Sequence, residues 1–183
     1  MPSVDAKRFN RLIEPHLDAL YGAAFRLARH TADAEDLVQD TCLRAYRHLG
    51  ELDESRPVMV WLRTVMHNVF VDGARRARRS PVTAAGDDAE LAGHACPSPN
   101  PEESALLTQR EEELQRAWSK LDRGHQALLA LRAEGHSLPE IAAITALPIE
   151  ALESRLYRAR SNFARHLEEE RVPPVAIKKE MSQ

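Results

Sequence analysis

Hydrophobic residues recur at helical spacing along most of the chain, and the clearest case lies between residues 137 and 166. Ser137 can cap a helix there, and Glu140, three residues later, completes a capping box. After a turn at residues 145–147, Pro148 opens a second helix at a position where proline is pre-organised for one. The apolar residues of this second helix fall on one side (Ile149, Leu152, Leu156, Ala159 and Phe163).

The other side of this second helix is mostly polar and carries Glu150, Glu153, Ser154, Tyr157 and Arg158, with Arg155 and Arg160 flanking it. A short helix, a tight turn and a longer helix with an outward polar row are typical of a helix-turn-helix, whose second helix enters the major groove of DNA. An ordinary helical hairpin with solvated arginines would give the same spacing. The pattern therefore predicts a DNA-reading element and leaves that alternative open.

Further helices are predicted before this element. Residues 5–29 carry an apolar stripe that we expect to bend or restart at Pro15, because proline removes one hydrogen bond from the helical ladder. Two more helices are expected at residues 33–49 and 57–79, and two others from about 102 to 121 and from 125 to 134. Gly135 closes the last of these.

The segment from Ser80 to Pro101 breaks the helical pattern. It holds four prolines, two glycines and several acids, with little apolar periodicity. Such a segment cannot bury enough surface to offset its chain entropy, so we expect a flexible linker. The predicted fold is all-α, with two helical domains at residues 5–79 and 102–170 and a frayed tail at 171–183.

The helix expected at residues 33–49 has two distinct sides. One side is apolar and is predicted to be buried (Val38, Cys42, Ala45 or Tyr46, and Leu49). Acids in a first helical turn are favoured by the helix dipole, which accounts for Glu35 and Asp36 without any partner. It does not account for Gln39 and Asp40 beside Leu43, a mixed surface that is more typical of a site for a protein partner.

The end of the helix at residues 57–79 is locally cationic. Between Trp61 and Arg79 one acid, Asp72, faces five arginines (Arg63, Arg75, Arg76, Arg78 and Arg79). Arginines at a helix C-terminus are stabilised by the dipole, but four in five residues exceed that need. Contact with phosphates is therefore the favoured interpretation.

Composition and charge narrow the classes further. The 183 residues are 43% hydrophobic and only 5% aromatic, with a net charge of -3, so nucleic-acid binding would depend on local basic patches. No apolar run is long enough to span a membrane, and the start of the chain lacks the apolar core of a signal peptide, so we expect a cytosolic protein. Cys42 and Cys96 are too few and too far apart for a metal framework.

No catalytic motif appears. The chain has no glycine-rich phosphate loop, no G-x-S-x-G, no H-E-x-x-H and no cluster of Ser, His and Asp. The acids at residues 111–113 lie on a charged helical face that suits solvation. We therefore expect no enzyme activity, no cofactor and no metal.

Two blocks of the chain carry a family resemblance. The residues DAEDLVQDTCLRAYRHL (33–49) with WLRTVMHNVFVDGARRARR (61–79), and LPEIAAITALPIEALESRLYRAR (138–160), resemble a bacterial RNA polymerase sigma factor of the extracytoplasmic-function (ECF) type. The resemblance extends from about Phe9 to His166. It implies a transcription initiation factor that binds core RNA polymerase and promoter DNA and helps to open the promoter, and it implies control by an anti-sigma factor.

The resemblance also implies roles for single residues. Residues 52–59 match the loop that captures a flipped-out base of the minus-ten element, a step that costs a few kcal/mol. Trp61 matches a family tryptophan, although a core anchor is the favoured role. The residues expected to contact the coiled-coil clamp of the polymerase are Asp36, Leu37, Gln39, Asp40 and Leu43. Those expected to contact DNA are Asn68, Arg75, Arg76, Arg78 and Arg79 in the first domain and Ser154, Arg155 and Arg158 in the second.

The chain departs from the family pattern at the start of the predicted recognition helix. Relatives usually show P-V-G-T-V-K/R-S-R, where this chain shows Pro148-Ile-Glu-Ala-Leu-Glu-Ser-Arg155. Glu150 and Glu153 put two carboxylates where phosphates repel them and where only the amine of cytosine or adenine can donate. Two rival functions follow: a sigma-like decoy that binds an anti-sigma protein without productive DNA binding, and a plain helix-turn-helix repressor, which would leave the surface at residues 33–49 unexplained.

Overall fold

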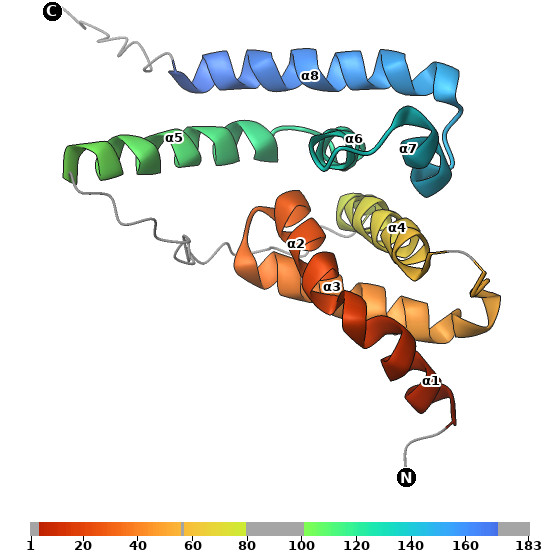
Figure 1. Ribbon diagram of the computed structural model, residues 1–183. Helices are drawn as coiled ribbons and strands as arrows, with labels where there is room; N and C mark the ends of the chain where they lie inside the picture. Colours follow the sequence, from red (N-terminus) through yellow and green to blue (C-terminus); the bar gives the residue numbers. More distant parts are fainter. Residues whose placement is uncertain (1–3, 56, 80–100, 172–183) are drawn as a thin grey trace, which may run out of the picture.

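The computed structural model describes residues 4–55, 57–79 and 101–171 of the chain, and these residues form helices with no strand among them (Figure 1). The predicted all-α fold is confirmed. The first half holds α1 (Val4–Ile13), α2 (Leu17–Ala28), α3 (Thr31–Arg47) and α4 (Val58–Arg79). The second half holds α5 (Pro101–Ser119), α6 (Arg123–Ala133), α7 (Leu138–Thr145) and α8 (Ile149–Arg171).

Short helical turns connect the elements of the first half. The interruption expected at Pro15 is confirmed, because residues Glu14–His16 form a 3-10 turn between α1 and α2. A second 3-10 turn, Leu49–Glu51, follows α3 and leads into the loop before α4. Helix α2 packs against α3, and α3 packs against α4, so these three helices enclose the first core. The largest fully buried side chains of that core are Ile13, Leu20 and Leu62.

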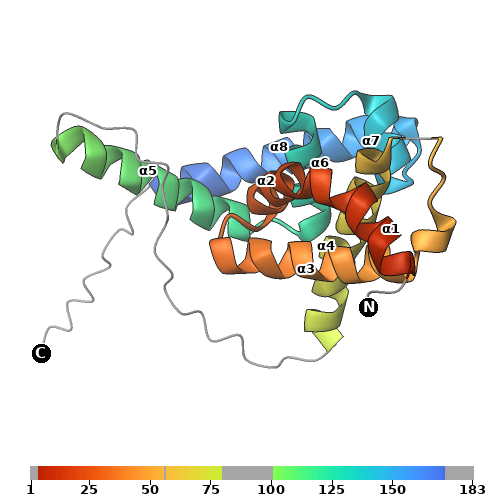
Figure 2. The ribbon, with the colours of Figure 1, turned by 60° about the horizontal axis from the view of Figure 1, so that its bottom comes forward.

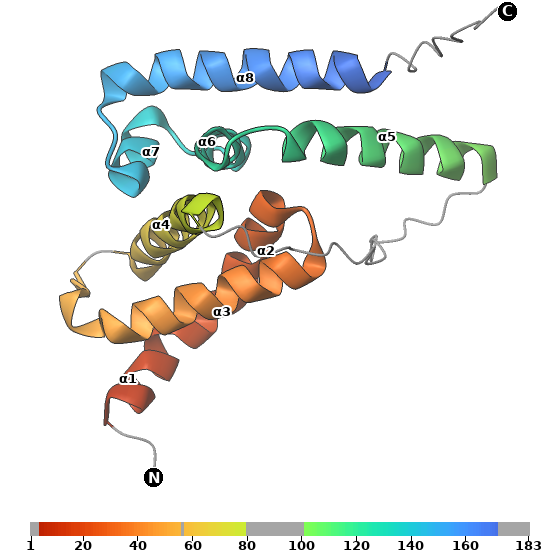
Figure 3. The same cartoon turned by 180° about the vertical axis from the view of Figure 1, so that it is seen from behind.

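The second half is organised around α8. Helix α5 runs along α8 from one side, while α6 and α7 pack against the other end of α8 (Figures 1 and 3). A small second core of six buried residues joins α6, α7 and α8 (Leu128, Leu131, Ile141, Ile144, Leu152 and Leu156). Gly135 has φ +89 just after α6, a conformation that glycine adopts without steric cost, as its predicted role at the end of the helix requires.

The two halves pack on one another. Helix α6 lies between them and contacts α2 and α4 on one side and α7 and α8 on the other, while α7 also contacts α4 (Figure 2). Two small residues of α6, Ala127 and Ala130, are 1% and 4% exposed and belong to the core of the first half. Helix α4 ends at Arg79 and α5 begins at Pro101. The expected linker and tail lie outside the described residues, and the domain boundaries stay a prediction.

Candidate protein and nucleic-acid interfaces

The exposed face of α3 carries the predicted polymerase-binding residues. Asp36, Gln39 and Asp40 are exposed, and Leu43 is 57% exposed, which is unusual for a large apolar side chain. We call these four residues the α3 face. The opposite side of the helix is buried at every third or fourth residue (Ala34, Leu37, Thr41 and Ala45). The α3 face is therefore a solvent-facing mixture of acid, amide and leucine, as expected of a protein-binding surface.

Leu37 corrects one expectation. Its side chain is 7% exposed and belongs to the first core, so it does not lie on the α3 face. The sequence predicted a buried stripe through Val38 and Cys42, but these two residues are only partly buried. The buried stripe of α3 includes Thr41, a polar residue that the apolar spacing could not identify. Its hydroxyl donates to the carbonyl of Leu37 at 2.6 Å, so its hydrogen-bonding need is met inside the core.

Residues 52–55 of the loop before α4 are held by burial, by hydrogen bonds and by an ion pair. Leu52 is 7% exposed, and Asp53 accepts hydrogen bonds from the backbone N–H and the hydroxyl of Ser55 at 3.0 and 2.6 Å. An ion pair of 2.7 Å between Arg8 and Glu54 ties the loop to α1. These contacts hold the loop in one shape beside the start of α4.

Asn68 is exposed on α4, as its predicted role in DNA binding requires. It shares one side of the helix with Val60, which is 40% exposed and lies two turns earlier, next to the loop. Its neighbour His67 is largely buried, and burial lowers the pKa of the His67 imidazole despite the opposing effects of Asn68 and Asp72. Asn68 therefore faces solvent from the helix that follows the loop.

The four arginines at the end of α4 are placed only by their backbone. Arg75, Arg76, Arg78 and Arg79 belong to the last turns of the helix, but their side chains lie outside the described residues. One turn earlier, Asp72 forms an ion pair of 3.3 Å with Arg44 of α3. The arginine-rich end of α4 therefore comes directly after a turn of the helix that is ion-paired to α3.

The helix-turn-helix has the predicted geometry. The carboxylate of Glu140 accepts from the backbone N–H and the hydroxyl of Ser137 at 2.8 and 2.7 Å, and these bonds lower the pKa of Glu140. The turn between α7 and α8 contains Ala146 with φ +55. Helix α8 then buries Leu152 and Leu156 in the second core, and Ala159 is buried one turn later. The sequence, the cap and the turn agree on one short helix followed by a longer one.

The outward side of α8 carries the predicted DNA-reading residues. Ser154, Arg155 and Arg158 are all exposed, and so are Glu150 and Glu153. Within the described part of the chain, neither Glu150 nor Glu153 is ion-paired with a cation. The side chains that could face DNA are thus free to approach it, including the two carboxylates that disfavour phosphates.

Of two exposed apolar residues of α8, one differs from expectation and the other lies on the side where it was expected. Ile149 was predicted to be buried but is 42% exposed, because it begins the helix beyond the reach of the second core. Tyr157 is 72% exposed and lies one turn after Glu153, so a large aromatic ring projects from the outward side. Both apolar side chains enlarge the solvent-facing surface of α8.

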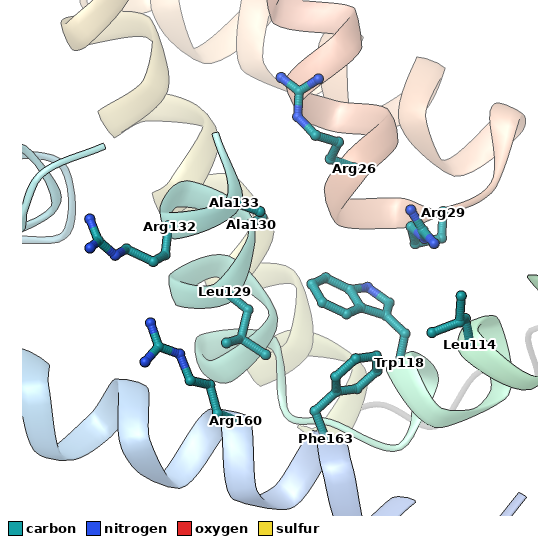
Figure 4. A pocket seen from close by; sticks show the side chains of 10 residues that line it. All are labelled: Arg26, Arg29, Leu114, Trp118, Leu129, Ala130, Arg132, Ala133, Arg160 and Phe163. Carbon is teal, nitrogen blue, oxygen red and sulfur yellow. The ribbon is translucent and has the colours of Figure 1, made fainter. Parts of the chain in front are cut away.

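A groove of about 460 Å³ lies at the junction of the two halves and escaped the sequence analysis (Figure 4). Its floor is apolar and includes Trp118 and Phe163, whose rings meet edge to face at 5.9 Å. Four arginines from three helices and one loop position surround it (Arg26, Arg29, Arg132 and Arg160). No acid lines the groove. Its residues are far apart in sequence, so no local pattern could have revealed it.

Neither a metal cluster nor a membrane-spanning helix is found among the described residues. In the ranges 4–55, 57–79 and 101–171, no three His, Cys, Asp or Glu side chains gather in a way that could hold a metal ion. No helix in those ranges is long and apolar enough to cross a membrane.

Comparisons with known proteins identify the family. Residues 12–80 match the model of sigma-70 region 2. Over 165 residues the chain is 30% identical to the ECF RNA polymerase sigma factor EcfG of Rhodopseudomonas palustris. The aligned region covers 90% of this chain and 86% of EcfG. The chain belongs to the ECF sigma factors of RNA polymerase. The RNA polymerase sigma factor CnrH of Cupriavidus metallidurans is 33% identical to this sigma factor over 167 residues, with 88% and 87% of the two chains covered.

A solved structure agrees with this assignment. The sigma factor RpoE of Bartonella quintana, crystallised with the anti-sigma factor NepR, matches this sigma factor with a TM-score of 0.61 and 27% identity. The match covers 88% of this chain and 98% of RpoE. The chain spans 40% of the length of one longer curated relative and 87% of CnrH. The family resemblance read from the two sequence blocks is thereby confirmed.

Proposed function

We propose that this ECF sigma factor directs core RNA polymerase to specific promoters in the cytoplasm and assists promoter opening without catalysing a reaction. The observation that carries the proposal is the α3 face, where two acids, an amide and a leucine are exposed on the segment with the most specific family signature. We propose residues 5–79 and 102–170 as its two functional domains. The first would bind polymerase and the minus-ten element, and the second would bind the minus-thirty-five element.

The polymerase contact uses charge and apolar surface together. Asp36 and Asp40 would face basic residues of the coiled-coil clamp, while Leu43 would enter an apolar position of the same partner. Such complementarity speeds association and fixes the register of the complex. Leu37 is omitted from this contact, since it is needed inside the core.

DNA contact is divided between the two halves. The anchored loop and Asn68 would hold a flipped base of the minus-ten element, and the arginines at the end of α4 would follow the backbone. Ser154, Arg155 and Arg158 would read the minus-thirty-five element in the major groove. Glu153 would restrict that reading to bases that offer an amine.

The proposal is tested by run-off transcription with purified core polymerase. We expect the wild-type chain to form holoenzyme and to direct transcripts from its own promoter. The double variant Asp36→Ala with Asp40→Ala should lose most of its affinity for core polymerase while keeping wild-type helicity. The matched control is Asp5→Ala with Asp18→Ala, which removes two exposed acids from α1 and α2. Equal polymerase affinity in the two double variants would refute the role of the α3 face.

The second candidate is a sigma-like decoy, which the exposed Glu150 and Glu153 favour. A decoy would bind an anti-sigma factor but would give no run-off transcript with core polymerase. Control by an anti-sigma factor is part of both candidates, and the RpoE structure with NepR supports it by similarity. Transcription in the absence of any partner therefore separates the two.

A further inference from the structure

A buried carboxylate joins the two halves of the chain. Glu134 follows α6 in the second half, and its side chain is only 7% exposed. One of its oxygens accepts from Arg26 Nε of α2 at 3.0 Å, and the other is bonded by Arg63 of α4. The side chain of Arg63 is 14% exposed, so this second pair is shielded from solvent on both sides. We call Glu134, Arg26 and Arg63 the latch.

The charges of the latch make Glu134 necessary to it. Burial lowers the pKa of the Arg63 guanidinium, and the nearby charge of Arg26 lowers it further, so the two cations repel one another. Glu134 supplies the opposite charge, and the negative end of the α6 dipole reinforces it. Without the carboxylate, the first half would present two unneutralised cations to the end of α6. The attraction between the halves at this point would then be lost, and the two cations would repel one another within the first half.

Other contacts between the two halves lie along α5 and α6. The indole N–H of Trp118 in α5 donates to the carbonyl of Leu27 at the end of α2, at 3.0 Å. Arg123 of α6 donates to the carbonyl of Phe70 in α4 at 3.1 Å and lies over the Phe70 ring at 4.7 Å from its centroid. The alanines of α6 fill the first core. The halves are thus joined by polar contacts around a closely packed seam.

The joined form cannot reach both promoter elements at once. The minus-ten and minus-thirty-five elements lie roughly 25 base pairs apart, which is roughly 85 Å of DNA. A compact chain of 183 residues has a radius of gyration of about 16 Å, and hence a diameter of about 40 Å. The α3 face and Asn68 nevertheless stay exposed in the joined form. Polymerase could therefore dock while the latch is closed, but reading of both elements requires it to open.

We propose that the latch is an autoinhibitory contact: Glu134 holds the free sigma factor closed through Arg26 and Arg63, and its release lets the two halves separate along a promoter. The proposal rests on the proposed function, because it assumes that both halves contact DNA. It adds that closure is built into this chain and needs no partner protein. Polymerase docking on the α3 face then precedes opening.

Small-angle X-ray scattering of the purified full chain tests the closed state. Glu134→Gln keeps the size of the side chain and removes its charge. Two bodies of about 75 residues whose centres stand about 40 Å apart would give a radius of gyration of about 23 Å, against about 16 Å when closed. We expect the wild type near the smaller value and Glu134→Gln shifted toward the larger one. The linker and tail contribute equally to both chains.

Glu170→Gln is the matched control. Glu170 also has a side chain that is only 15% exposed and pairs with two cations, Arg116 and Lys120, at 2.7 Å each. All three residues belong to the second half, so this variant should keep the wild-type radius. A second readout is acrylamide quenching of Trp118 in a Trp61→Phe background. Quenching should increase in Glu134→Gln and remain unchanged in Glu170→Gln.

The functional consequence is measured with holoenzyme. Glu134→Gln should form promoter complexes several-fold faster on a template with both elements, because a larger fraction of molecules is competent to span them. The rate on a template that lacks the minus-thirty-five element should not change. A wild-type chain that already scatters as an extended particle would overturn the proposal, as would wild-type radius and quenching in Glu134→Gln.

Two further results keep the test decisive. If circular dichroism shows that Glu134→Gln fails to fold, Arg26→Gln replaces it, since Arg26 is 43% exposed and its loss removes one arm of the latch. An Arg26→Gln chain with wild-type radius and quenching would then overturn the latch. Failure of the proposed function has a different signature: the wild-type holoenzyme would give no transcript, while the radius and quenching still report on closure.

Discussion

The two hydrophobic cores of this sigma factor differ in how far each is complete without the other half. The first core is built almost wholly from α1 to α4. The second half adds Ala127 and Ala130 of α6, which are buried in it, and Trp118 of α5, which is partly buried and packs against it. The second core consists of six buried residues on three helices. One of those helices, α6, has its other side committed to the first half. The comparison indicates that the first half is the scaffold and that the second half, with its smaller core, is the less stable of the two and gains stability from contact with it.

Truncation of one leucine in each core should give the largest effect. Leu62 and Leu152 are both 0% exposed, and replacement of a buried leucine by alanine costs about 2–5 kcal/mol. We expect Leu152→Ala to unfold the second half at lower urea than the first, and Leu62→Ala to destabilise both halves together. Urea titration followed by hydrogen exchange on α3 and α8 measures this. A single shared transition in both variants would instead make the chain one cooperative unit.

Overpacking of α6 tests the seam between the halves. Ala127 is 1% exposed, so Ala127→Leu has no space for its added carbons and should cost about 1–3 kcal/mol. Ala133→Leu places the same side chain on an exposed position of α6 and is the control. The difference between their urea midpoints measures how tightly the scaffold holds the second half. Equal midpoints would mean that the seam is loose.

Acid should weaken the scaffold through His67. Because burial lowers the pKa of His67 in the folded chain, the unfolded chain binds its proton first as the pH falls below about 6.5. The stability that His67 contributes is therefore present at neutral pH and is lost as the pH falls through its folded pKa. Thermal melts between pH 7.5 and 5.5 should show a smaller decrease in Tm for His67→Gln than for wild type. The exposed His48 provides the control, and an equal decrease in His48→Gln and His67→Gln would exclude this cause.

Charge reversal on α8 should have the smallest effect. It concerns the side of the second half that we propose faces DNA. Glu153→Arg removes a carboxylate that repels phosphates and adds one phosphate contact, so the dependence of log K on log salt should steepen by up to roughly one unit. Promoter binding by holoenzyme at several salt concentrations measures the slope. An unchanged slope would place the side chain away from DNA.

The sequence predicted the helices, the break at Pro15 and the helix-turn-helix correctly because each depends on local residues such as caps, prolines and apolar spacing. It misplaced Leu37 because Thr41, a polar residue, completes the buried stripe of α3. It misplaced Ile149 because the extent of the second core depends on three helices rather than on one. Spacing within a helix does not say where a neighbouring core ends.

The latch could not be predicted from the sequence at all. Arg26, Arg63 and Glu134 are separated by 71 to 108 positions from residue to partner, and each sits among other charged residues that are merely solvated. Only the fold distinguishes Glu134 from the exposed glutamates elsewhere in the chain. The roles of the α3 face, Asn68 and the α8 residues remain proposals, since exposure permits contact and does not identify the partner.

The backbone conformation of Ala146 affects the orientation of α8 relative to α7. An alanine at φ +55 is held in a conformation that costs roughly 1–2 kcal/mol, which glycine would avoid. The turn between α7 and α8 is therefore strained, and the packing around it holds it in this conformation. Under the proposed function, the buried contacts of Ile144 and Leu152 set the angle at which α8 would meet the double helix, so a substitution inside this core would alter promoter choice without changing any residue proposed to contact DNA.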